Sequence, residues 1–140
     1  MHDHADDESA AIRLLLVEDD VGDAVLTREL LLDAGLDMAL DRTMNLSDAE
    51  SRAAEEADCV LLDLGLPDAG GLDAVTRMRH VAPEVAIIVL TGLDDAKRRA
   101  EALEAGAQDY IVKGSVDGDE LAERVGAAIE QRRRECASEV

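Results

Sequence analysis

Three features of the sequence predict an α/β fold, in which a five-stranded parallel sheet is doubly wound with helices on both faces. Five short apolar runs alternate with five segments of helical periodicity. The connections between them are short, and most contain Gly or Pro. Two of the runs, at residues 60–62 and 85–90, are apolar throughout, which is typical of strands that helices cover on both sides. Strands and helices that alternate in this way build a parallel sheet.

The first strand is expected at residues 12–17. A helix follows at about residues 22–34 and ends at Gly35, since glycine is the usual residue after a helix's last turn. Residues 38–43 form a shorter and more polar strand, which suits the edge of a sheet. The apolar positions of the helix are Val25, Leu26, Leu30 and Leu31.

A capping box predicts the start of the second helix. Ser47 stands three residues before Glu50, so that each side chain can bond the other's backbone amide. The buried strand at residues 60–62 comes after this helix. The inward side chains expected of the helix are Leu46, Ala49, Ala53 and Ala57.

A third helix is predicted by Leu72, Val75 and Met78, which recur at helical spacing. Pro83 separates it from the apolar strand at residues 85–90. The remaining elements expected are a helix at 94–105, a strand at 109–112 and a helix at 117–134.

The chain is expected to hold one domain, because its 140 residues are near the commonest domain size. Residues 1–11 are polar and acidic and are expected to form a disordered arm. Residues 12–131 form the folded domain. Residues 132–140 are expected to be a C-terminal tail or the start of a linker.

The charge of the chain excludes several classes of partner. Its formal net charge is −19, which opposes direct binding to nucleic acid phosphates and to anionic membranes.

Neither a signal peptide nor an apolar run of about 20 residues, as a membrane helix needs, is evident. The two cysteines, Cys59 and Cys136, form no disulfide framework. These features favour a cytoplasmic protein.

Polar side chains follow four of the predicted strands. Right-handed crossovers place the carboxyl ends of parallel strands at one edge of a sheet, so these side chains are expected to share one crevice. Clustered carboxylates and hard oxygen ligands suit Mg²⁺, and with Mg²⁺ bound an aspartate can accept a phosphoryl group. The alternative is that Asp63 merely ends a strand. The side chains that converge are Glu18, Asp19, Asp63, Thr91 and Lys113.

Four motifs in this order resemble the receiver domain of two-component response regulators. They are LLLVEDD at 14–20, VLLDLGLPDAGGL at 60–72, VLTG at 89–92 and AQDYIVKG at 107–114. The resemblance covers about residues 12–131. It implies a flavodoxin-like sheet with strand order 2-1-3-4-5.

By this resemblance, Asp63 accepts a phosphoryl group from a histidine kinase or a phosphotransfer protein in the presence of Mg²⁺. The domain is then a signalling switch rather than an enzyme, and its only chemistry is self-catalysed gain and loss of the group. The implied site residues are Glu18, Asp19, Asp63 and the carbonyl of Gly65 at the metal, Asp63, Thr91 and Lys113 in phosphoryl transfer, and Thr91 with Tyr110 as the switch pair.

The resemblance also implies a surface that changes on phosphorylation. It is made by the helix at 94–105, the strand at 109–112 and the last helix. A homodimer or an output domain following residue 140 would dock there. Two sequence features resemble receiver domains that precede phosphatase or diguanylate cyclase output domains. They are the sequence QDYIVKGSVDG and the arginine-rich end of the last helix. An excised module is therefore slightly favoured over a stand-alone regulator.

Three positions bear on the shape of the site and on the lifetime of the phosphorylated state. Gly114 follows Lys113 where the family usually has proline, so the loop is expected to differ in shape. Gly65 lacks a side chain and Leu93 is apolar, so the lifetime of the phosphorylated state is open.

A hydrolase with an aspartyl nucleophile, of the haloacid dehalogenase type, is the competing enzymatic interpretation. That class resembles an Asp-x-Asp pattern in which the second aspartate is the general acid. Gly65 occupies that position here, which disfavours the interpretation.

Overall fold

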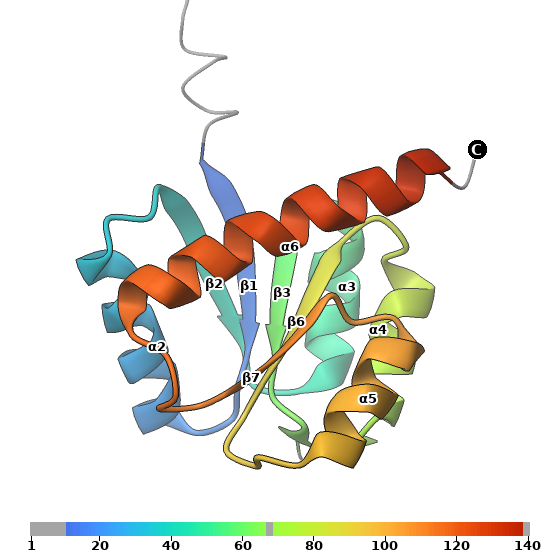
Figure 1. Ribbon diagram of the computed structural model, residues 1–140, viewed down its shortest axis with the longest axis horizontal. Coiled ribbons are helices and arrows are strands. Elements are labelled where there is room, and N and C mark those ends of the chain that lie inside the picture. Colours follow the sequence, from blue (N-terminus) through green and yellow to red (C-terminus); the bar gives the residue numbers. More distant parts are fainter. Residues whose placement is uncertain (1–10, 67–68, 139–140) are drawn as a thin grey trace, which may run out of the picture.

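Five parallel strands form the central sheet in the computed structural model of the protein, which describes residues 11–66 and 69–138. Their order is β2-β1-β3-β6-β7, and the ribbon in Figure 1 shows helices packed around them. Counted along the chain, this is the predicted order 2-1-3-4-5, so the flavodoxin-like fold is confirmed. The strands are β1 (Ile12–Val17), β2 (Met38–Thr43), β3 (Cys59–Leu62), β6 (Ala86–Thr91) and β7 (Asp109–Val112).

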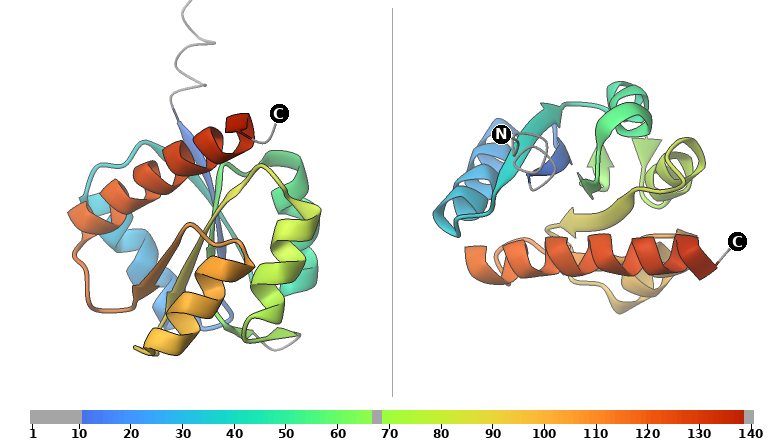
Figure 2. Two further views of the ribbon diagram at one scale, coloured as in Figure 1. Left: turned by 45° about the vertical axis from the view of Figure 1, so that its right-hand side comes forward. Right: turned by 90° about the horizontal axis from the view of Figure 1, so that it is seen from above.

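The described residues form five helices, which cover both faces of the sheet (Figure 2). On one face α2 packs beside α6, and on the other α3, α4 and α5 form a row. A doubly wound sheet requires this division, because successive right-handed crossovers change face where the strand order reverses. The helices are α2 (Val21–Asp33), α3 (Leu46–Glu56), α4 (Asp73–Val81), α5 (Ala96–Ala105) and α6 (Gly118–Ser138).

Side chains of the central strands alternate between two buried clusters. Leu14 and Leu16 of β1 pack under α2 and α6, whereas Leu15 and Val17 pack under the other three helices. Both sets are buried, which explains why the central strands are apolar without a break. Leu, Val, Ile and Ala build nearly all of both clusters, and the single aromatic residue, Tyr110, is fully buried in the second.

The predicted capping box at the start of the second helix is wrong. Asn45 caps α3: its side chain accepts a hydrogen bond of 2.9 Å from the amide of Asp48, and its backbone is extended. The helix begins at Leu46, one residue before Ser47. Either side chain could serve as a cap, and Asn45 is selected because Leu46 must turn inward at the first helical position, where it is fully buried.

The apolar residues of α2 are divided between its buried and its exposed sides. Val25 and Leu26 are more than half exposed, and the buried positions are Ala24, Thr27 and Leu31. Apolar residues occur on several sides of this helix, so their periodicity alone does not predict which side faces the sheet. Small side chains face the sheet, and larger apolar ones remain at the surface. The predicted end of the helix is confirmed, since Gly35 has the positive φ of 77° that favours glycine.

The last helix is longer than the predicted segment at 117–134, because it continues through Ser138. Side chains of its final turns bind the body of the domain: Arg132 donates to the carbonyl of Pro83, and Glu135 accepts from Gln108. Other boundaries shift by one or two residues, with β6 at Ala86–Thr91 and α5 at Ala96–Ala105. The predicted disordered arm falls almost entirely on residues 1–10, outside the described residues.

A short antiparallel pair follows β3 and was not predicted. Gly65–Leu66 (β4) pairs with Ala69–Gly70 (β5), and together they form a two-stranded ribbon. The ribbon comes directly after Asp63, so it shapes the loop beside that residue.

Candidate functional site

The carboxyl ends of the strands meet at one edge of the sheet, which we call the carboxyl edge. Main-chain hydrogen bonds align them: the amide of Asp63 donates to Val17 at 3.1 Å, and the amide of Lys113 donates to Thr91 at 2.7 Å. Glu18 and Asp19 follow β1, Asp63 follows β3, and Thr91 ends β6. The predicted convergence of strand ends is therefore present, and the side chains differ in how closely they approach one another.

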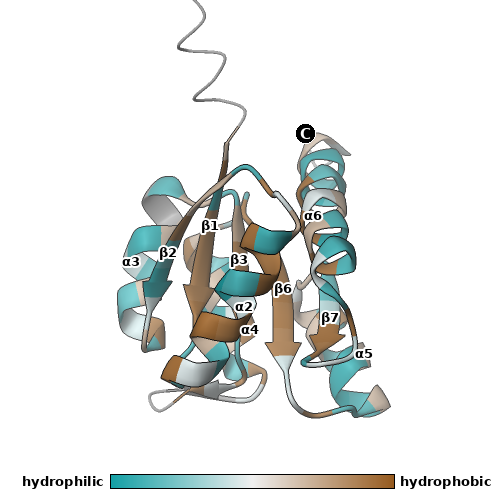
Figure 3. Ribbon diagram, turned by 90° about the vertical axis from the view of Figure 1, so that its left-hand side faces the viewer, coloured by the Kyte–Doolittle hydropathy of each residue, from teal (hydrophilic) through white to brown (hydrophobic). Residues whose placement is uncertain are grey.

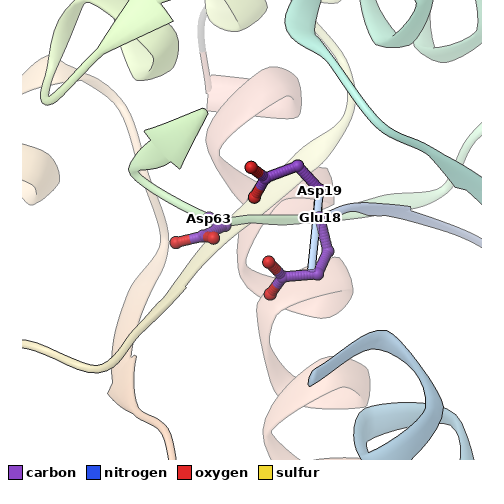
Figure 4. Close-up of side chains that lie close together, drawn as sticks. All are labelled: Glu18, Asp19 and Asp63. Atoms are coloured by element: carbon purple, nitrogen blue, oxygen red, sulfur yellow. The ribbon is translucent and has the colours of Figure 1, made fainter. Parts of the chain in front are cut away.

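Three carboxylates lie together at this edge. One oxygen from each of Glu18, Asp19 and Asp63 lies within 4.8 Å of the others, and Figure 4 shows their carboxylate groups turned to the same side. Glu18 is buried, Asp63 is half-buried and Asp19 is exposed, so the cluster opens to solvent. Three hard oxygen donors, with open positions for water, fit Mg²⁺.

Burial changes the chemistry of Glu18. It raises the pKa of this carboxyl to about 7, further aided by the hydrogen bond and charge of Asp63, while the hydrogen bond from Lys113 opposes the rise. A buried carboxylate beside another carboxylate is costly unless a cation compensates both. The cluster therefore favours a bound divalent cation more strongly than an exposed acidic patch would.

Lys113 supplies the positive charge of the site. Its Nζ lies 2.6 Å from Glu18 Oε1, 2.9 Å from Asp23 Oδ2 and 3.7 Å from Asp63 Oδ2. Burial acts to lower the pKa of Lys113, but the hydrogen bonds to Glu18 and Asp23 outweigh it, and the pKa is raised. The ammonium is thus charged and stands within an ion-pair distance of Asp63.

The predicted switch residues are joined through the loop after β6. The Tyr110 hydroxyl donates to the carbonyl of Leu93 at 2.7 Å, and the Leu93 amide donates to Thr91 Oγ1 at 3.3 Å. Tyr110 is fully buried and lies in the inward position. Burial, and then the charge of Asp95, raises the pKa of its phenol, which keeps the hydroxyl a donor. Leu93 therefore connects the two residues by its backbone, although its own side chain is exposed.

Gly65 follows Asp63 at the start of β4, and Gly114 comes directly after Lys113. The amide of Gly65 donates to Asp63 Oδ1 at 3.2 Å, and a Cβ at this position would lie 3.8 Å from the same oxygen. The predicted metal contact of the Gly65 carbonyl stays a prediction. Gly114 has a φ of 83°, which proline cannot adopt, so the loop after Lys113 departs from the proline-containing form.

Sequence reasoning missed two side chains near these residues. Asp23 binds Lys113 from the first turn of α2. Arg99 of α5 donates to the Tyr110 carbonyl at 2.8 Å, and its guanidinium lies 5.0 Å from the centre of the Tyr110 ring. Arg99 gave no signal in the sequence. Asp23 gave a weak one, as a carboxylate one helical turn beyond the acidic pair.

Comparison with known proteins gives concordant results. The model of the response regulator receiver domain family matches residues 14–126. The response regulator protein PmrA of Pseudomonas aeruginosa is 34% identical over 122 residues, which span 83% of this chain and 52% of PmrA. The chemotaxis protein CheY of Thermotoga maritima is 29% identical, over 72% of this chain and 84% of CheY. The chain thus spans about half the length of PmrA and most of CheY.

Solved structures agree with the sequence comparisons. The crystal structure of a putative response regulator from Chloroflexus aurantiacus superposes with a TM-score of 0.75 at 27% identity, and covers 86% of this chain and 98% of that one. Across the described residues, every helix is too short or too polar to cross a membrane. The motifs, the strand order, the acidic edge and these relatives lead to one conclusion: the chain belongs to the receiver domain family of two-component response regulators.

Proposed function

We propose that Asp63 accepts a phosphoryl group from a histidine kinase or a phosphotransfer protein, and that the modified domain controls a partner or an attached output domain. The observation that carries the proposal is the meeting of Glu18, Asp19 and Lys113 around Asp63 at the carboxyl edge. A structural aspartate at the end of a strand would need neither the metal-binding pair nor the ammonium. The proposed function implies a cytoplasmic protein.

The transfer uses an oxygen of Asp63 as the nucleophile. That oxygen forms a bond to phosphorus while the bond from phosphorus to the donor breaks, and the electron pair leaves on the imidazole nitrogen of a phosphohistidine or on the acyl oxygen of acetyl phosphate. Mg²⁺ held by Glu18, Asp19, Asp63 and the Gly65 carbonyl would neutralise the charge of the carboxylates and of the phosphoryl oxygens. Lys113 binds one phosphoryl oxygen as a point charge, and the Thr91 hydroxyl donates to another.

Tyr110 and Thr91 connect this chemistry to the surface. Thr91 gives up the hydrogen bond from the Leu93 amide when its hydroxyl turns to the phosphoryl group. The loop from β6 to α5 then adjusts, and with it the Tyr110 contact to the Leu93 carbonyl. The surface of α5, β7 and α6 is where a second copy or an output domain is proposed to dock. Ala102 is the only fully buried side chain of α5, so this helix packs lightly and shifts readily.

An apolar stripe on α2 is the proposed binding surface for the protein that donates the phosphoryl group. Val21, Val25 and Leu32 lie on one side of this helix and are each about half exposed or more, and Figure 3 shows α2 in front of the sheet with apolar segments at its surface. The helix starts just after the acidic pair, so a protein that brings a phosphohistidine to Asp63 would cover it. A Val25→Lys variant should lose transfer from a protein donor and keep transfer from acetyl phosphate.

The proposal is tested with acetyl phosphate and Mg²⁺. Intact mass spectrometry should show the addition of one phosphoryl group to the wild-type chain and none to Asp63→Asn. Asp73→Asn, which changes a carboxylate at the start of α4, is the matched control and should react as the wild type does. Addition of a phosphoryl group to the Asp63→Asn variant would remove Asp63 from the role. Steady hydrolysis of external phosphate esters is not expected, because Gly65 stands where a general acid would be needed.

A further inference from the structure

Asp23 holds the Lys113 ammonium more closely than Asp63 does. Its Oδ2 lies 2.9 Å from the ammonium, whereas Asp63 Oδ2 lies at 3.7 Å. Glu18 Oε1 holds the same ammonium at 2.6 Å. Lys113 thus has two strong hydrogen bonds that do not involve the proposed phosphoacceptor.

The backbone of Asp23 is fixed by the start of α2. Its amide donates to Oδ1 of Asp20, the capping residue, at 2.9 Å. A simpler interpretation is that Asp23 only complements the positive end of the helix, as acidic residues in first turns do. That role does not require contact with Lys113, whose side chain is only 21% exposed and is shared with the buried Glu18. The contact therefore links the helix start to the site.

The distance from Lys113 to Asp63 has a chemical consequence. At 3.7 Å the ammonium is beyond a good hydrogen bond to the Asp63 oxygen, so that oxygen stays free to attack phosphorus. A phosphoryl oxygen carried by Asp63 can become the ammonium's partner once the new bond has formed. An ammonium that moved onto Asp63 would neutralise the nucleophile before the reaction.

We propose that Asp23 is a positioning residue, which keeps the Lys113 ammonium at the distance that suits a phosphoryl group rather than the bare carboxylate. The proposal rests on the proposed function of Asp63. It is an instance of preorganisation, in which a charged group is fixed before the reaction instead of being rearranged during it. Without Asp23, the ammonium turns toward Asp63, the next carboxylate in order of distance.

The test compares phosphorylation rates with acetyl phosphate at saturating Mg²⁺. Asp23→Asn should react more slowly than the wild type, by up to about a hundredfold, because a misplacement of about 1 Å at a reacting group can cost that much. Asp23→Glu should recover part of the rate. The matched control is Asp48→Asn, since Asp48 occupies the same first-turn position in α3 with its amide capped in the same way at 2.9 Å. This control should react like the wild type.

A double-variant cycle separates positioning from a general effect of charge or stability. If Asp23 acts through Lys113, Asp23→Asn should cause no further slowing in a Lys113→Ala background. Removal of a negative charge by itself would speed the reaction with an anionic donor, so a slower rate cannot come from that source. An Asp23→Asn rate equal to or above that of the wild type, or an undiminished effect in the Lys113→Ala background, overturns the proposal. A wild-type chain that gains no phosphoryl group instead refutes the proposed function.

Discussion

The positively charged side chains at the two edges of the sheet have different kinds of partner. At the amino edge, where the strands begin, Arg79 donates to the carbonyls of Ala82, Pro83 and Val85, and also to Gly106 and Gln108. These acceptors are uncharged groups in fixed positions. At the carboxyl edge a single ammonium, that of Lys113, faces the carboxylates of Glu18, Asp23 and Asp63, with Asp19 beside them.

The difference separates a structural use of charge from a functional one. The two terminal nitrogens of Arg79 bond neutral oxygens of the fold, so this guanidinium connects segments of the chain to one another. The carboxyl edge holds more negative charge than Lys113 can balance, so its most stable state includes a cation from solution. Disturbing the first edge should weaken the fold, whereas disturbing the second should alter the response to ligands.

The largest effect is expected at the amino edge. Arg79→Met removes the donors to several partly buried carbonyls and should lower the free energy of unfolding by about 2–4 kcal/mol. Chemical denaturation measures this loss. Arg77→Met on the same helix is the control, because Arg77 is 42% exposed and bonds the carboxylate of Glu50, so its loss should cost less than the loss of the Arg79 cluster. Equal losses for the two variants would contradict the structural role assigned to Arg79.

Magnesium should stabilise the fold through the carboxyl edge. At ten to a hundred times its dissociation constant, Mg²⁺ that binds only the folded state adds about 1.4–2.7 kcal/mol. Thermal unfolding in low-salt buffer, with and without Mg²⁺, detects the shift in melting temperature. The shift should be retained in Arg79→Met and lost in Asp19→Asn. A wild-type melting temperature indifferent to Mg²⁺ would contradict the metal site.

The affinity for Mg²⁺ should depend on pH through Glu18. Because the pKa of Glu18 is raised to about 7, a proton competes with the metal below neutrality, and the affinity should rise about tenfold from pH 6 to pH 8. Without metal the sign reverses: stability falls as pH increases from 4.5 to about 7, since the folded state must then ionise a buried carboxyl. Calorimetric titration at both pH values measures the affinity. A Glu18→Gln variant should show a flat profile.

The smallest effect is a gain in stability when the acidic edge is relieved. In magnesium-free buffer, Asp63→Asn removes one of the mutually repelling carboxylates and should raise the free energy of unfolding by about 0.5–1 kcal/mol. Urea denaturation at low ionic strength measures the change, which should shrink in added salt. A loss of stability would show that Asp63 serves the fold as the Arg79 cluster does.

Much of the fold could be predicted because the local and long-range signals agree. The apolar runs of β3 and β6 are buried on both faces, so periodicity and burial coincide, and the crossover rule then fixes where Asp63 and Thr91 lie. At α2 these signals diverge. Val25 and Leu26 are apolar but exposed, and only tertiary packing shows that Ala24 and Thr27 face the sheet.

The convergence of the strand ends was predictable, and the contacts between their side chains were less so. Strand ends bring Glu18, Asp19, Asp63 and Lys113 together whatever their rotamers. The partner of Lys113 on α2 could not be deduced, because it depends on the direction of one side chain in a helix turn. The hydrogen bond from the Tyr110 hydroxyl to Leu93 could not be deduced from the sequence either, because its acceptor is a backbone carbonyl and any residue would supply one.

The length of α6 joins the two edges mechanically. Gly118 begins it five residues after Lys113, and Arg132 fastens its far end to Pro83 at the amino edge. At a rise of about 1.5 Å per residue, its 21 residues make a rod of roughly 31 Å. Tilting the helix by about 3° around its first turn moves Arg132, which lies 14 residues or about 21 Å from Gly118, by roughly 1.1 Å, enough to stretch its 3.0 Å bond to the Pro83 carbonyl beyond a good hydrogen bond. The hydrogen bond from Arg132 to Pro83 therefore resists movements of α6 that begin near Lys113. It is the contact on which a tilt of the helix would first act.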